Sequence, residues 1–94
     1  INDFNRAIAL NPDYYKGYNN RGFAYAKSGQ YQNAVNDYSE AIRLKPDYAR
    51  AYDNRAMLHL NQGNYLWGCR DAQKACALGS CSALKTAVNN GHCR

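Results

Sequence analysis

The feature that most constrains the fold of this chain is an internal repeat of 34 residues. The segment Asn11–Tyr14 (NPDY) returns as Lys45–Tyr48 (KPDY), and other residues recur at the same shift. The matched residues are Pro12 and Pro46, Asp13 and Asp47, Tyr14 and Tyr48, Tyr18 and Tyr52, Asn20 and Asn54, Arg21 and Arg55, Gly29 and Gly63, Tyr31 and Tyr65, Asp37 and Asp71, and Ala7 with Ala41 and Ala75. One period that holds over so many positions indicates stacked copies of a single structural unit.

Each unit is predicted to contain two helices. In residues 16–28 the apolar and small residues recur every three or four positions, and Gly29 provides a helix stop. Residues 31–44 carry a broad apolar face, and Pro46 ends the pattern because proline disfavours a helical residue before it. No alternating pattern typical of strands competes with this signal. We therefore predict an all-α fold of antiparallel helix-turn-helix units.

Charge and chemistry exclude several function classes. The chain has 12 Lys and Arg against seven Asp and Glu, a net charge of +5, and these cations are scattered singly rather than clustered as in a nucleic-acid-binding arm. No stretch approaches the ~18 apolar residues of a membrane span. Glu40 is the only glutamate, the two histidines are isolated, and no glycine-rich phosphate loop occurs. We predict no enzyme activity, no cofactor, no nucleic-acid partner and no membrane insertion.

At this point the chain resembles the tetratricopeptide repeat family. The resemblance is carried by the 34-residue period and by Tyr18, Gly22, Tyr25, Gly29, Tyr31, Ala34, Tyr38, Ala41 and Pro46. It implies an α-solenoid with a short C-terminal capping helix. The implied organisation is the end of a truncated repeat (1–14), a complete repeat (15–48), a second repeat (49–82), and a capping helix with a cysteine-containing tail (83–94). We expect the chain to be the C-terminal end of a longer protein.

In this family the first helices of successive repeats line a concave groove that binds extended peptides. The resemblance therefore implies a protein-interaction scaffold whose partner is another protein or peptide segment. The candidate groove residues are Tyr14, Lys16, Asn19, Asn20, Phe23, Lys27, Tyr48, Arg50, Asp53, Asn54, Met57 and Asn61. Asn20 and Asn54 are equally candidates for hydrogen bonds between helices. The alternative function is a homo-oligomerisation module that acts through the exposed N-terminal half-repeat and the convex surface.

All four cysteines fall in the last 26 residues. Cys69 and Cys76 lie two turns apart on one helix, about 10.5 Å along its axis, beyond the Cα separation of ~7 Å that a disulfide spans. Residues 82–90 predict a short helix with Cys81 before it and Cys93 beyond its end. If this helix packs antiparallel on the preceding one, the nested pairs Cys76–Cys81 and Cys69–Cys93 fit. They would fasten the end of the repeat array.

Two other states of the cysteines remain open. Cys69 and Cys76 stand where the preceding repeat has Val35 and Ile42, so reduced cysteines would fit as small core residues. A zinc site with His92 is the weaker alternative, because the paired C-x-x-C spacing is missing. The arrangement ACxLxxC also resembles that of cysteine-rich helical-repeat proteins secreted by bacteria. That resemblance implies a bacterial, extracytoplasmic protein, either periplasmic or secreted, although this chain shows no signal peptide.

Two further expectations concern side chains outside the groove. We expect Arg21 and Arg55 to pair with aspartates or to be solvated rather than to contact a ligand. Trp67 takes the position of Asn33 in the preceding repeat. We expect Trp67 to pack under the cap helix and the tail, or else to mark a contact with another domain or protomer.

Overall fold

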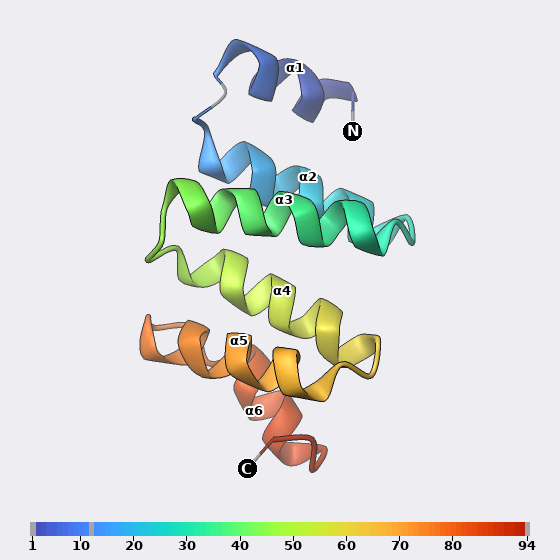
Figure 1. Cartoon of the computed structure of the whole chain (residues 1–94), viewed down its shortest axis with the longest axis vertical. Coiled ribbons are helices and arrows are strands. Elements are labelled where there is room, and N and C mark those ends of the chain that lie inside the picture. The colour runs from blue at the N-terminus through green and yellow to red at the C-terminus, as the bar shows by residue number, and fades with distance from the viewer. Residues whose placement is uncertain (1, 12, 94) are drawn as a thin grey trace. The chain divides into compact units, whose positions relative to one another are not determined.

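In the computed structural model, which describes residues 2–11 and 13–93, every regular element is an α-helix. The prediction of an all-α fold is confirmed (Figure 1). The chain divides into two compact units, residues 1–46 and 47–94. The described helices are α1 (Asn2–Leu10), α2 (Tyr15–Lys27) and α3 (Tyr31–Leu44) in the first unit, and α4 (Ala49–Asn61), α5 (Tyr65–Ala77) and α6 (Ser82–Asn89) in the second.

Glycine ends the first helix of each hairpin. Gly29 has φ +80°, a left-handed conformation that glycine adopts without a steric cost. The reversal lets the Gln30 amide donate to the Tyr25 carbonyl at 2.9 Å, which satisfies a carbonyl at the helix end. Gly63 repeats this arrangement with φ +79°. These stops explain why the predicted helix limits agree with the structure to within one residue at α2 and at both ends of α3.

In the first unit, α2 and α3 pack as a hairpin around a tyrosine. The Tyr38 side chain is buried, and its ring lies against Gly22 of α2. A Cβ atom at Gly22 would lie 2.8 Å from Tyr38 Cε1, so only glycine fits here without a shift of the ring. Burial, with the Asp37 charge beside it, raises the pKa of Tyr38 to about 12. The large aromatic and the glycine are therefore one packing solution.

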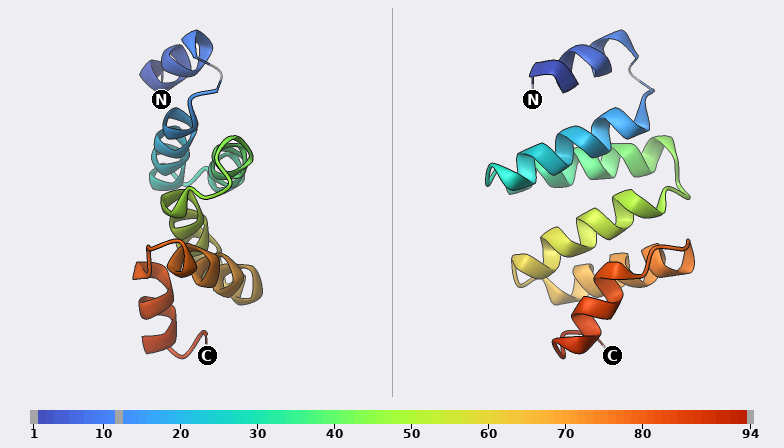
Figure 2. Two further views of the ribbon diagram at one scale, coloured as in Figure 1. Left: turned by 90° about the vertical axis from the view of Figure 1, so that its left-hand side faces the viewer. Right: turned by 180° about the vertical axis from the view of Figure 1, so that it is seen from behind.

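In the second unit, the equivalent contact between the two hairpin helices is made by smaller residues, and a third helix joins it. Ala56 and Ala72 occupy the positions equivalent to Gly22 and Tyr38, and they form a fully buried cluster with Ala83 of α6. Without the tyrosine ring, an additional helix reaches this cluster. Figure 2 shows α6 running back at a steep incline to α5 rather than lying parallel to it.

A neighbouring cluster joins the tail to the same unit. Leu60 of α4, Ala87 of α6 and Cys93 are buried together. Leu60 needs a glycine opposite it, because a Cβ atom at Gly68 would lie 2.7 Å from Leu60 Cγ. The equivalent pair in the first unit is Ala26 and Ala34. Relative to that pair, Leu60 is larger and Gly68 is smaller. The longer Leu60 side chain reaches Cys93 in the tail.

Candidate functional site

Four of the candidate residues form one exposed stripe on α2. Lys16, Asn20, Phe23 and Lys27 follow a spacing of four, three and four, which places them on a single face of a helix. All four are exposed, Phe23 by 47%. The Lys27 ammonium lies 4.8 Å from the centre of the Phe23 ring, a cation–π distance. The stripe presents an amide and an apolar ring between two cations.

The other two candidates of the first unit differ in exposure. Tyr14 precedes α2 and is 37% exposed. Asn19 lies on α2 but is only 2% exposed, so its amide faces the interior of the fold. Sequence position placed both Asn19 and Asn20 on the first helix. Only Asn20 lies on the stripe, because one residue step turns the side chain by about 100° around the helix axis.

The equivalent positions on α4 are more covered. Arg50 and Asn61 are exposed, whereas Tyr48 and Asn54 are half-buried. Met57 is also half-buried, because it packs against the alanine cluster that includes Ala83.

Asp53, another candidate on α4, has a bond within the unit. Its Oδ1 accepts the backbone N–H of Ala83 at 3.0 Å. This N–H belongs to the first turn of α6, where amides have no partner within the helix. The carboxylate thereby fastens α6 to α4. It also lies at the helix end where a negative charge is favourable.

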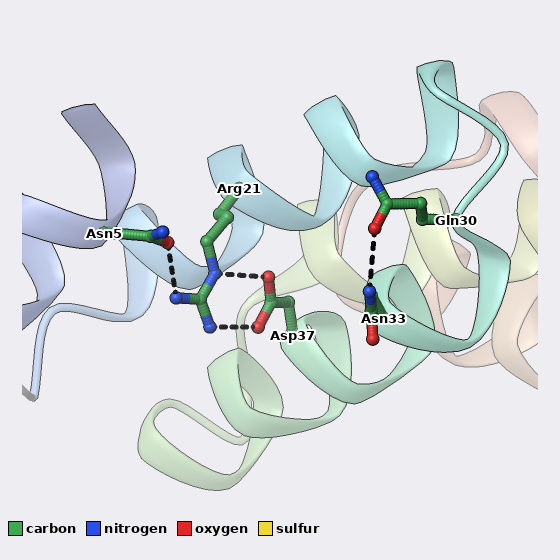
Figure 3. Close-up of polar contacts among 5 residues, drawn as sticks. All are labelled: Asn5, Arg21, Gln30, Asn33 and Asp37. Atoms are coloured by element: carbon green, nitrogen blue, oxygen red, sulfur yellow. Dashed lines mark hydrogen bonds and ion pairs between the residues drawn. The ribbon is translucent and has the colours of Figure 1, made fainter. Parts of the chain in front are cut away.

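In each hairpin, an arginine of the first helix pairs with an aspartate of the second helix. Arg21 donates from Nε and Nη2 to both carboxylate oxygens of Asp37, each at 2.7 Å (Figure 3). Arg55 and Asp71 repeat this geometry at 2.7 and 2.9 Å. Arg21 also donates from Nη1 to Asn5 Oδ1 at 2.9 Å, which joins α1 to the hairpin. Arg21 and Arg55 were expected either to pair with aspartates or to be solvated, and the structure shows the pairing.

His59 lies beside the second of these pairs. Its Nε2 is 3.9 Å from Asp71 Oδ2, the oxygen that accepts a bond from Arg55. Burial lowers the pKa of His59 from 6.5, and this outweighs the opposing effect of Asp71, while Arg55 lowers it further. His59 takes the position of Tyr25 in the preceding repeat, and its lowered pKa favours the uncharged ring at neutral pH.

The cysteines form two disulfides with the nested pairing that the sequence favours. Cys69 is bonded to Cys93, with Cα atoms 5.7 Å apart, and Cys76 to Cys81, with Cα atoms 4.0 Å apart. The first ties the tail to α5, and the second closes the turn between α5 and α6.

The outer side of α5 differs from the prediction for Trp67. Trp67 is 56% exposed and does not lie under the cap, and the Arg70 guanidinium lies 5.3 Å from its ring centre. The tail contacts Tyr65 instead, because the His92 ring stacks on it with centroids 4.2 Å apart, although Tyr65 stays 43% exposed. Arg70 and Lys74 were not candidates from the sequence. Comparing this helix with α3, where Lys74 aligns with Glu40, would have singled them out.

Residues 2–11 and 13–93 contain no group of three His, Cys, Asp or Glu side chains arranged to hold a metal ion. Of the helices in these residues, none combines the length and the hydropathy that crossing a membrane requires.

Two family models match the chain. One, described as TPR repeat, matches residues 24–63, and the other, described as tetratricopeptide repeat, matches residues 4–36. Together they span residues 4–63. No curated protein matches the chain.

Solved structures resemble the fold over most of the chain. YrrB, described as a TPR protein with an unusual peptide-binding site, is 22% identical with a TM-score of 0.79, over 82% of this chain and 40% of its own. MamA is 29% identical with a TM-score of 0.76, over 80% of this chain and 44% of its own. The TPR2B domain of yeast Sti1, in complex with pHsp70, is 23% identical with a TM-score of 0.78, over 93% of this chain and 70% of its own. The chain therefore spans less than half the length of YrrB and of MamA.

Proposed function

We propose that this chain, which models of the tetratricopeptide repeat match over residues 4–63, binds an extended segment of a partner protein through the first helices of its repeats. The observation that carries the proposal is the exposed stripe Lys16, Asn20, Phe23 and Lys27 on α2. Two structures of the same fold support it, since YrrB is described by its peptide-binding site and Sti1 is in complex with pHsp70. Our proposal covers which residues contact the partner and what kind of partner binds there.

The chemistry of the stripe suits an extended backbone. The side-chain amide of Asn20 both donates and accepts, so it matches the N–H and C=O groups of a peptide. Phe23 offers an apolar ring, and Lys16 and Lys27 attract carboxylates from either end. The two lysines are eleven positions apart, about 16 Å along the helix axis, which is the length of about five extended peptide residues. On α4, Arg50 and Asn54 repeat the cation and the amide.

The test is peptide binding by matched variants. Peptides are recovered from a random display library on the full, oxidised chain and measured by fluorescence anisotropy. We expect Asn20→Ala together with Phe23→Ala to weaken binding at least tenfold, because the amide and ring contacts are lost. Gln32→Ala, an exposed amide on α3, is the control and leaves affinity unchanged. Equal affinity of the stripe variant and the wild type for every recovered peptide would contradict the proposal.

We also propose an extracytoplasmic location, periplasmic or secreted. Among the described residues all cysteines are paired, and disulfides persist in oxidising compartments. The measurement is intact mass after alkylation of unfolded protein taken from its native compartment. Four alkylated cysteines without prior reduction would exclude this location. No alkylation before reduction and four after it is the expected result.

Self-association is the second candidate function, and one observation favours it. Leu10, at the end of α1, is 81% exposed. This side chain stands in solvent at the end of the N-terminal half-repeat, where a second copy can contact it. Sedimentation equilibrium over a range of concentrations tests this. A mass that rises with concentration in the wild type but not in Leu10→Lys supports self-association, and a constant monomer mass rules it out.

A further inference from the structure

The outer face of α5 carries exposed apolar and cationic side chains together. Leu66 is 65% exposed and Trp67 56% exposed. Arg70 and Lys74 are also exposed, and they follow at the spacing of three and four that keeps residues on one side of a helix. We call Leu66, Trp67, Arg70 and Lys74 the α5 face. Large apolar side chains in solvent, next to cations, are typical of a contact surface.

The equivalent helix of the first repeat provides an internal reference. The positions that match the α5 face on α3 are Gln32, Asn33, Asn36 and Glu40. There the side chains bond among themselves: Gln32 donates to Asn36 Oδ1 at 3.0 Å. Asn33 donates to Oε1 of Gln30, the residue just before α3, at 3.0 Å (Figure 3). Glu40 is paired with Arg43. The same element of the repeat is thus built with a polar outer face whose charges cancel.

The exchange of residues between the two faces is not required by packing. On both helices the core contacts come from other positions, such as Ala34 and Ala41 on α3 and Ala72 and Ala75 on α5. The second repeat nevertheless replaces two amides with Leu66 and Trp67, and a glutamate with Lys74. Since the fold tolerates the polar version, the apolar and cationic version needs a reason outside the hairpin.

Among the described residues, no acidic side chain forms an ion pair with Arg70 or Lys74 of the α5 face. The Arg70 guanidinium lies over the Trp67 ring. The aspartate next to it in sequence, Asp71, is buried and takes both its bonds from Arg55. No other acidic residue lies on α5, whose sequence is YLWGCRDAQKACA. Carboxylates of a partner would therefore meet two cations beside an apolar anchor.

We propose that the α5 face binds a segment of a partner protein that carries carboxylates beside a large apolar side chain. The apolar side chain packs on Leu66 and Trp67, and the carboxylates pair with Arg70 and Lys74. A second copy of this chain is disfavoured, because a symmetric contact would bring the cations of both copies together. A membrane surface is disfavoured as well. A helix that lies in a membrane needs apolar residues along its length, and here they occupy only the first turn.

This site is separate from the α2 stripe and uses different residues, so one selection tests both. Peptides from a random display library are recovered on the full, oxidised chain. The stripe variant Asn20→Ala with Phe23→Ala, and the face variant Leu66→Gln with Trp67→Asn, then sort the peptides by site. The face variant restores the residues of α3, which the fold already accommodates. Circular dichroism verifies that each variant keeps its helix content.

The expected result is a class of peptides, rich in Asp and Glu beside an aromatic or aliphatic residue, that loses at least tenfold affinity in the face variant only. Arg70→Asn with Lys74→Glu keeps Trp67, the single tryptophan of the chain, as a fluorescence reporter. We expect the wild type to show a saturable shift of Trp67 emission with such a peptide. The charge variant should bind at least tenfold more weakly, and added salt should reduce wild-type affinity.

Several results would overturn the proposal. One is that every recovered peptide binds the face variant as well as the wild type; if those peptides are lost in the stripe variant, only the function proposed for α2 stands. A second is a face-dependent class without acidic residues. A third is an emission shift with vesicles of anionic phospholipid but with no acidic peptide, which would make the α5 face a membrane contact. A fourth is a concentration-dependent mass that Trp67→Asn abolishes, which would make it a contact between copies.

Discussion

The arginine–aspartate pairs illustrate how a repeated residue serves the fold rather than a ligand. Arg21 and Asp37 are 16 residues apart and join α2 to α3, and their side chains are only 21% and 7% exposed. The Asp37 hydrogen bond raises the pKa of Arg21, so the guanidinium stays charged at every accessible pH. The rings of Tyr18 and Tyr25 lie 5.5 and 5.7 Å from it. A charge held in this way has lost most of its hydrating water, so removing its partner should destabilise the fold.

A double-mutant cycle on this pair tests that statement. We expect Arg21→Ala and Asp37→Ala each to destabilise the chain, because each leaves a poorly solvated charge without its partner. The double variant should lose less than the sum, which gives a coupling energy of about 1–3 kcal/mol. Urea unfolding followed by circular dichroism measures it. The exposed pair Glu40 and Arg43 is the control and should show much weaker coupling. Additive losses at Arg21 and Asp37 would contradict the prediction.

His59 gives a second test at this scale, through pH. Its folded-state pKa is lowered below 6.5 by burial, so the unfolded chain binds this proton more readily than the folded chain. The free energy of unfolding should therefore fall as the pH decreases from 6.5, and the contribution is absent above it. His59→Tyr, which restores the residue of the first repeat, should reduce this loss. Melting temperatures between pH 7.5 and 5 measure the effect, and an equal pH slope in both proteins would contradict it.

Among the elements, α6 depends on the small residues beneath it. Ala72 leaves the space in which Ala83 of α6 packs, whereas the equivalent Tyr38 fills that space in the first unit. We expect Ala72→Tyr to displace α6, at a cost of about 1–3 kcal/mol from overpacking. Hydrogen exchange should then accelerate at the amides of α6 but not at those of the first hairpin. Ala77→Tyr, which adds the same ring on the exposed side of α5, is the matched control. Unchanged protection of α6 in Ala72→Tyr would be the contrary result.

How far the sequence predicts these elements depends on the physical origin of each. The helices follow from periodicity and from stops such as Gly29, which act locally, so their limits were predictable. An ion pair between Arg21 and Asp37 was predictable, because an arginine and an aspartate that both recur at the same period are opposite charges at fixed positions of each repeat. The incline of α6 was not, since it depends on how Ala83 packs against Ala56 and Ala72, a tertiary contact that no local pattern signals. The burial of Asn19 was not predictable either. Asn19 and Asn20 are neighbours on one helix, and only the tertiary contacts determine which of the two side chains faces the interior.

The second unit as a whole depends on cross-links, because its last helix is too short to be stable alone. α6 has eight residues, fewer than an isolated helix needs. It is held by the Ala56–Ala72–Ala83 cluster, by the Asp53 bond to Ala83, and by the two disulfides. The cysteine spacing predicted these pairs, because the rise of a helix sets which thiols can meet. In the cap, two disulfides thus take the place of the packing that a full repeat would supply.

The two disulfides should contribute unequally to the stability of the molecule. Cys69–Cys93 closes a segment with a sequence separation of 24, and Cys76–Cys81 one of 5. Loop-closure entropy assigns the longer loop about 3.5 kcal/mol and the shorter about 2 kcal/mol. We therefore expect Cys69→Ala with Cys93→Ala to lower the urea midpoint more than Cys76→Ala with Cys81→Ala. With a dithiol reductant present, the wild type should fall below both oxidised variants. The opposite order of the two variants would show that the short loop, rather than the tail, secures the cap.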